Sequence, residues 1–300
     1  MTKIRHKVLR IIGVLGVLFC ISFFITHPSF PTPDKILILS FFVFLIFHQA
    51  TEMLKRLGPF VALILVYESF RGVADSLHSQ VNYSLAPKFD TFLFGNLPTI
   101  QLQNFLWQGQ VRWYDFVLYV PYLLFFVLPL ALALLVWKTR DEYYWRVVGT
   151  YLAVFFAGFL TFLLIPAAPP WLAAENHYID PITRISSDVW QSLGIVDFPS
   201  FYDKLSPNPV AAIPSLHAAA ATLFPIFIFK LYGRRYGALS LIYPLLIYIG
   251  VVYQGEHYFF DILLGIIYAV AGYFLYPRAA KTLSHLFKKA RTQLKLSLQR

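Results

Sequence analysis

Long apolar runs recur along most of this sequence. A run of roughly 17 to 25 apolar residues can cross the hydrocarbon core of a bilayer as an α-helix. With 58% hydrophobic and only 13% charged residues, the 300-residue chain has too few polar side chains to cover a soluble domain. The sequence therefore predicts an all-α, polytopic transmembrane helical bundle of about eight spans, near 8–26, 36–54, 58–74, 114–137, 146–165, 215–232, 237–255 and 257–276.

The net charge of +10 could suggest a nucleic-acid-binding protein. The basic residues instead form clusters between the apolar runs, without a single basic patch, so we expect no nucleic-acid partner. With both termini in the cytoplasm, most of them lie on the inner side of the membrane, as the positive-inside rule requires. The exceptions, in or beside outer segments, are Lys35, Arg71, Lys88, Arg112, Arg184 and Lys204. These positions predict a multi-pass integral membrane protein, which in a prokaryote would lie in the cell membrane.

No repeat or low-complexity linker divides the chain, so residues 1–277 are predicted to form one transmembrane domain. Residues 278–300 alternate basic and apolar side chains and are predicted to form an amphipathic cytoplasmic tail. Two long connections, 75–113 and 166–214, both emerge on the outer side. Loops of this length in a compact protein are usually functional or disordered.

The segment Ala-Ile-Pro-Ser-Leu-His-Ala at 212–218 opens the sixth apolar run directly after a loop. Free backbone N–H groups and the positive end of the helix dipole would lie beside Ser215, which is a suitable place for a phosphate group. His217 follows two residues later and adds a titratable ring at the same helix end.

The segment Gly-Glu-His-Tyr-Phe-Phe-Asp at 255–261 joins the last two predicted spans. A spacing of four residues puts His257 and Asp261 on one helix face, where the carboxylate can hold one ring nitrogen protonated and leave the other free to attack. The predicted topology places His217 and His257 at the same outer level of the membrane. Alternatively, each histidine only forms hydrogen bonds in the interface.

Pro-Ser-Leu-His followed by His-x-x-x-Asp resembles the type 2 phosphatidic acid phosphatase superfamily. The resemblance implies that His257 is the nucleophile, Asp261 orients it, His217 protonates the leaving oxygen and Ser215 binds phosphate. It also implies a six-helix core within about 110–276, which makes 1–277 a catalytic domain.

Several positions differ from the usual family pattern. Leu216 replaces a glycine, residues 250–251 are Gly-Val where Ser-Arg is usual, and the Lys-x6-Arg-Pro motif is missing. The motifs at 94–98, 168–171 and 255–261 are similar to the inositol phosphorylceramide synthase branch and its bacterial relatives. Members of that branch pass a phosphoryl head group from one lipid to another acceptor.

The missing arginines leave open which cation serves the phosphate. Arg71 is the first candidate, and a structural ion pair with Glu68 is the alternative. Four loop residues also lie on the correct side, and for each of them a solvated surface charge is the more frequent role: Lys88, Arg184, His177 and Lys204. Of these four, Lys88 is kept as a candidate for substrate binding. Gln254 and Glu256 flank the nucleophile, where they could contact an acceptor hydroxyl or cap the last helix. Gln254 and Tyr258 are also predicted to bind substrate.

The predicted function is an integral membrane phosphotransferase that moves a phosphate-linked head group between a lipid donor and a hydroxyl acceptor through a phosphohistidine. The expected substrate class is a sphingolipid or a phosphoinositide. With water as the acceptor, the same residues would make a lipid phosphate phosphatase. A transporter or scaffold without enzymatic activity is the alternative of a different class. The mechanism needs no metal and no cofactor, and the oligomeric state does not follow from the sequence.

Overall fold

The computed structural model describes residues 2–27, 33–74, 81–125, 127–194 and 209–297. Within these ranges the chain is helical, and β-structure is limited to isolated bridges that join Asn82, Ala167 and Ala211. The predicted all-α helical bundle is therefore confirmed. The α-helices are α1 (Thr2–Thr26), α2 (Pro33–Ile46), α3 (Ala50–Ala74), α4 (Leu85–Phe94), α5 (Pro98–Leu106), α6 (Trp113–Leu123), α7 (Val127–Thr139), α8 (Tyr144–Leu164), α9 (Pro170–Glu175), α10 (Ile185–Ser192), α12 (Leu216–Tyr232), α13 (Arg234–Ser240), α14 (Ile242–Tyr253) and α15 (Phe259–Ser297).

Among the described residues, four helical segments are long and apolar enough to cross a membrane. The bent pair α6 and α7 makes a fifth if it is counted as one span. The spans predicted near 36–54 and 215–232 correspond to the shorter apolar helices Lys35–Ile46 and Leu216–Tyr232. Fewer than eight segments of the described residues meet this criterion of length and composition. The four segments are Ile4–Thr26, Asp141–Leu164, Arg234–Tyr253 and Phe259–Leu286.

Two predicted spans have different boundaries in the structure. The span predicted over 114–137 is two helices that meet at 54°, because Pro121 and Pro129 each lack the N–H that a continuous helix would use. The span predicted over 36–54 ends at Ile46, because His48 takes a left-handed conformation with φ of 59° and turns the chain into α3.

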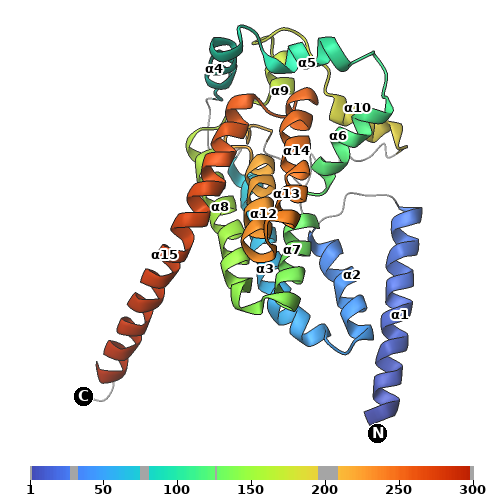
Figure 1. Cartoon of the computed structure of the whole chain (residues 1–300), viewed down its shortest axis with the longest axis vertical. Coiled ribbons are helices and arrows are strands. Elements are labelled where there is room, and N and C mark those ends of the chain that lie inside the picture. Colours follow the sequence, from blue (N-terminus) through green and yellow to red (C-terminus); the bar gives the residue numbers. More distant parts are fainter. Residues whose placement is uncertain (1, 28–32, 75–80, 126, 195–208, 298–300) are drawn as a thin grey trace.

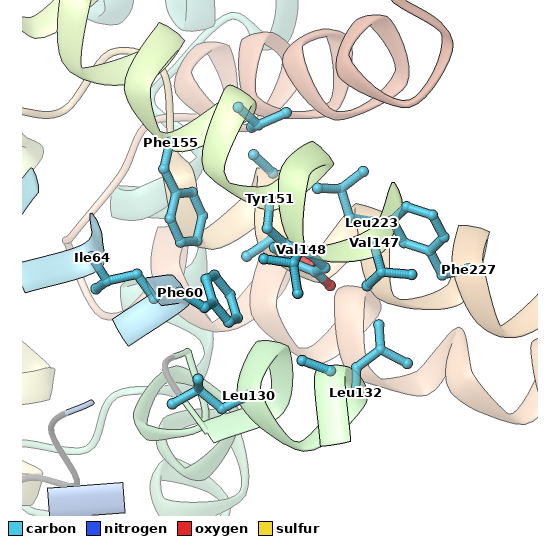
Figure 2. Close-up of a cluster of buried hydrophobic side chains, with 14 of the residues drawn as sticks. Phe60, Ile64, Leu130, Leu132, Val147, Val148, Tyr151, Phe155, Leu223 and Phe227 are labelled. Atoms are coloured by element: carbon cyan, nitrogen blue, oxygen red, sulfur yellow. The ribbon is translucent and has the colours of Figure 1, made fainter. Parts of the chain in front are cut away.

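The apolar core of the bundle lies between α3, α7, α8 and α12 (Figure 2). Tyr151 of α8 is fully buried at its centre, and its hydroxyl donates to the carbonyl of Ala220 on α12. Apolar side chains from the four helices interdigitate around it. Those labelled with it in the figure are Phe60, Ile64, Leu130, Leu132, Val147, Val148, Phe155, Leu223 and Phe227.

The short helices α4, α5, α9 and α10 gather at one end of the molecule, where α15 begins (Figure 1). The two chain termini lie at the opposite end. Helix α15 runs through Pro277 to Ser297 without a break at residue 278, and its C-terminal part extends away from the bundle (Figure 1). The predicted tail is thus a continuation of α15, and its position on a membrane surface stays a prediction.

Helices α12 and α15 approach each other closely at Gly265. A Cβ atom at this position would collide with the carbonyl oxygen of Ser215 and would lie 3.1 Å from the Cβ of Ala218. The backbone N–H of Ser215 also donates to the carbonyl oxygen of Asp261, at 3.0 Å. The absence of a side chain at Gly265 therefore lets the start of α15 lie directly against the start of α12.

We expect Gly265→Ala to lower the thermal unfolding midpoint in detergent, because the added methyl group has to push α12 and α15 apart. Gly58→Ala is the matched control, since a Cβ at Gly58 of α3 would meet no atom within 4 Å. This control is expected to be neutral or stabilising, by up to about 1 kcal/mol, because alanine is the better helix former. Equal midpoints for the two variants would contradict the tight packing at Gly265.

Candidate active site

Two histidines, one in the first turn of α12 and one just before α15, lie close together at the end of the bundle that bears α4 and α5. His217 lies in the first turn of α12, and His257 directly precedes α15. Their ring centroids are 5.6 Å apart. The side chain of His257 is buried, whereas that of His217 is half-buried. The structure therefore brings together the two rings that the predicted topology placed at one level.

Asp261 holds one side of the His257 ring. Its Oδ2 atom lies 3.3 Å from Nδ1 of His257 and accepts a hydrogen bond from the backbone N–H of Tyr258, at 3.0 Å. The Asp261 side chain is completely buried. With Nδ1 directed at this carboxylate, the nitrogen of His257 that remains for chemistry is Nε2.

Asp90 of α4 caps the start of α15 from a distant part of the chain. Its two carboxylate oxygens accept hydrogen bonds from the backbone N–H groups of Phe259, at 2.8 Å, and Phe260, at 2.9 Å. Burial raises the pKa of Asp90 to about 6, although the two backbone hydrogen bonds act in the opposite direction. Asp90 thus fixes the helix end that carries His257 and Asp261.

The His217 ring lies between two aromatic side chains of the bent α6–α7 pair. It stacks on Tyr122, with 4.4 Å between ring centroids and 15° between ring planes, and it contacts Phe125 at the same centroid distance. Tyr122 lies near the end of α6 and Phe125 lies in the break before α7. The break that was missed from the sequence therefore supplies an aromatic surface that orients His217.

Arg184 reaches the residue next to His257. Its Nε donates to Oε1 of Glu256 at 2.9 Å, and its guanidinium group lies 4.0 Å from the ring centroid of Trp171. The hydroxyl of Ser186 donates to the same Glu256 oxygen, at 2.5 Å. Burial raises the pKa of Glu256, but the Arg184 charge and these two hydrogen bonds outweigh burial and hold the pKa below its usual value.

Gln103 of α5 ties the Arg184 segment to the end of α14. Its side-chain amide donates to the carbonyls of Thr183, at 2.7 Å, and Tyr253, at 2.9 Å, and its Oε1 accepts from the N–H of Thr183. Sequence reasoning missed this contact and treated Arg184 as a surface charge. The available signal was Glu256, because an acidic residue in an apolar junction needs a cationic partner.

Two comparisons with known proteins found matches to this chain. The PAP2 superfamily matches residues 89–275, which include both histidines, Asp90, Arg184 and Asp261. The chain belongs to the PAP2 superfamily. It is an integral membrane protein with several membrane-capable apolar helices.

A relative from Bacteroides thetaiotaomicron carries the name phosphoinositol dihydroceramide synthase. The two sequences are 30% identical over 165 residues, which are 52% of this chain and 53% of the synthase. The chain therefore matches only about half the length of this relative. No solved structure matches the chain.

Three other predicted PAP2 site residues lie close to the histidines in sequence, and all three are fully buried. Ser215 is the N-cap of α12, where its hydroxyl accepts from the N–H of Ala218 at 3.2 Å. Within the part of the chain that the structure describes, the side-chain amide of Gln254 and the hydroxyl of Tyr258 have no hydrogen-bond partner. Ser215 thus stabilises a helix end, while Gln254 and Tyr258 offer buried polar atoms that a ligand or water could satisfy.

The structure describes the surroundings of Lys88 but not the side chain of Arg71. Lys88 lies on α4 in an open pocket of about 450 Å³, and the described residues that line this pocket do not include His217 or His257. The side chain of Arg71, like Lys204, lies outside the described residues. The predicted binding roles of Lys88 and Arg71 stay predictions.

A metal centre would need a set of donor side chains that converge on one point. Among the described residues, no group of three His, Cys, Asp or Glu side chains could hold a metal ion. At the site itself, Asp261 is directed at His257, and Glu256 is directed at Arg184 and Ser186.

The raised pKa of Asp90 predicts a pH-dependent stability. Because the folded protein holds this proton more tightly than the unfolded chain does, raising the pH from 4 to 7 removes stability, by on the order of 1–3 kcal/mol. Asp90→Asn resembles the protonated form, so this part of the pH dependence should disappear from its thermal unfolding midpoint in detergent. The exposed Asp180→Asn serves as the control. Equal pH profiles for Asp90→Asn and the unmodified protein would contradict the assignment.

Proposed function

We propose that this protein is a lipid phosphotransferase that moves a phosphate-linked head group from a lipid donor to a hydroxyl acceptor through a phosphohistidine at His257. The arrangement of His217, His257 and Asp261 is the observation that supports this proposal most directly. The His257 ring has the Asp261 carboxylate 3.3 Å from its Nδ1 atom and a second titratable ring, His217, 5.6 Å away between centroids. Membership of the PAP2 superfamily supports a lipid phosphate as the substrate.

In the first step, Nε2 of His257 attacks the phosphorus atom of the donor. A P–N bond forms while the P–O bond to the donor's lipid part breaks, and His217 gives its proton to the leaving oxygen. Asp261 stabilises the positive charge that develops on the His257 ring, because its carboxylate faces Nδ1. The products of this step are the neutral lipid alcohol and the phosphohistidine.

In the second step, the hydroxyl group of the acceptor attacks the same phosphorus atom. His217, now neutral, takes the proton of this hydroxyl, a new P–O bond forms and the P–N bond breaks. Both histidines return to their starting protonation states. With water in place of the acceptor, the same two steps hydrolyse the donor.

The name of the Bacteroides relative supports a more specific substrate class. A phosphoinositol dihydroceramide synthase, in the words of its name, makes a lipid from phosphoinositol and dihydroceramide. We therefore propose a head group of the phosphoinositol type and an acceptor with the hydroxyl group of a sphingoid lipid. The departures from the usual PAP2 motifs at 214–217 and 250–251 support the same branch.

The exposed aromatic side chains near the site suit an active site that opens to the bilayer. Phe92 and Phe94 on α4, Phe105 on α5 and Trp113 at the start of α6 are exposed. Aromatic rings of this kind favour the boundary between head groups and acyl chains. We propose that the site lies at the extracytoplasmic leaflet, with both termini in the cytoplasm and lateral entry for the lipid.

The test is a transfer assay with protein purified in detergent. A phosphatidylinositol labelled in its head group is incubated with and without a ceramide acceptor. We expect His257→Ala and His217→Ala each to lower transfer by at least about 10³-fold, because each removes a group that takes part in bond making. His285→Ala is the matched control, since this exposed histidine lies far along α15 and should leave the rate unchanged.

The acceptor arm of the assay separates the possible outcomes. Transfer to the ceramide that depends on its concentration supports a phosphotransferase, and release of the head group at the same rate without ceramide would show a hydrolase instead. Turnover retained by His257→Ala would overturn the phosphohistidine mechanism.

A further inference from the structure

The phosphate group of a PAP2 substrate needs a positive charge close to the attacking histidine. The Lys-x6-Arg-Pro and Ser-Arg positions that usually provide it are absent from this sequence. We propose that Arg184, held between Glu256 and the face of Trp171, is the cation that binds the substrate phosphate beside His257. This inference rests on the proposed function and names a binding residue of the same site.

Arg184 is held in place by two anchored partners. Glu256 directly precedes His257 in the chain, and its carboxylate bonds to Nε of Arg184. Trp171, which lies under the guanidinium group, donates its backbone N–H to the carbonyl oxygen of Gly255, at 3.1 Å. Both partners are thus tied to the short segment that carries His257, so the position of the Arg184 charge is fixed relative to the nucleophile.

The backbone next to Arg184 is fixed as well. The Gln103 side chain bonds to both the N–H and the carbonyl of Thr183 and to the carbonyl of Tyr253. Gly255 lies in a left-handed conformation with φ of 79°, and a Cβ there would be 3.3 Å from the Thr183 carbonyl oxygen. A glycine is therefore needed for this close approach between the two segments.

The two side chains of the Arg184–Glu256 ion pair differ in their exposure to solvent. The Glu256 side chain is 10% exposed, whereas the Arg184 side chain is 26% exposed. Arg184 is thus the more accessible member of this ion pair. Arginine presents five N–H donors in a planar fork that matches the oxygens of a phosphate group.

A purely structural ion pair would explain the same contacts, so an experiment has to separate structure from binding. A prepositioned cation costs no reorganisation when negative charge develops on the phosphoryl oxygens, which makes it valuable in a phosphoryl transfer. If Arg184 only held the loop, its substitution would change stability and leave phosphate affinity unchanged.

The experiment measures binding of inorganic phosphate to the full-length protein in detergent by isothermal titration calorimetry. We expect Arg184→Gln to weaken phosphate binding at least 10-fold, because a charge-assisted contact is lost. Arg184→Lys keeps the charge but loses the planar fork and should weaken binding about 3- to 10-fold. Arg112→Gln is the matched control, since this exposed arginine lies at the start of α6 outside the site, and it should bind phosphate like the parent protein.

A folded Arg184→Gln protein that binds phosphate as tightly as the parent would overturn the proposal. If the glutamine variant does not fold, the lysine variant decides, and an affinity within twofold of the parent would then overturn it. The same phosphate titrations can be carried out with His257→Ala protein, because binding of phosphate does not depend on turnover. Loss of the proposed function would appear as retained transfer by His257→Ala, whereas failure of the present inference would appear as unchanged phosphate affinity.

Discussion

The close approach of α12 and α15 is the contact on which the site depends. The N–H of Ser215 bonds to the carbonyl oxygen of Asp261, and Gly265 leaves room for the Ser215 backbone. Each helix begins at this contact, so the histidine at each helix start is carried to the same place. The 5.6 Å between the rings of His217 and His257 follows from this packing of two backbones.

The short helices α4, α5, α9 and α10 supply polar contacts to the helix ends of the bundle. Asp90 on α4 caps α15, Gln103 on α5 ties down Thr183, and Arg184 before α10 reaches Glu256. Each of these polar side chains is satisfied by a partner far away in the chain, which offsets the cost of burying it. The layer of α4, α5, α9 and α10 (Figure 1) therefore stabilises the helix ends, and the segment before α10 places Arg184 against Glu256, the residue that precedes His257.

The sequence was sufficient to predict the helical fold class and the proximity of the two histidines, because apolar periodicity and short motifs are local signals. The predicted helix boundaries were wrong at Pro129 and at His48, where a proline and a residue in the left-handed conformation change the helix ends. The sequence also failed for Arg184, because the Arg184–Glu256 pair joins positions 72 residues apart and no local pattern reports such a contact. The roles of the site residues remain predictions from the motif resemblance and this geometry.

The central claim is that His257 carries the phosphoryl group between donor and acceptor. The most direct measurement is peptide mass spectrometry of protein quenched in base shortly after it is mixed with the lipid donor in the absence of acceptor, because a phosphorus–nitrogen bond survives base and breaks in acid. The account predicts an acid-labile adduct of the phosphorylated head group on His257, absent from the His257→Ala protein. Active protein whose adduct lies on another residue would contradict it.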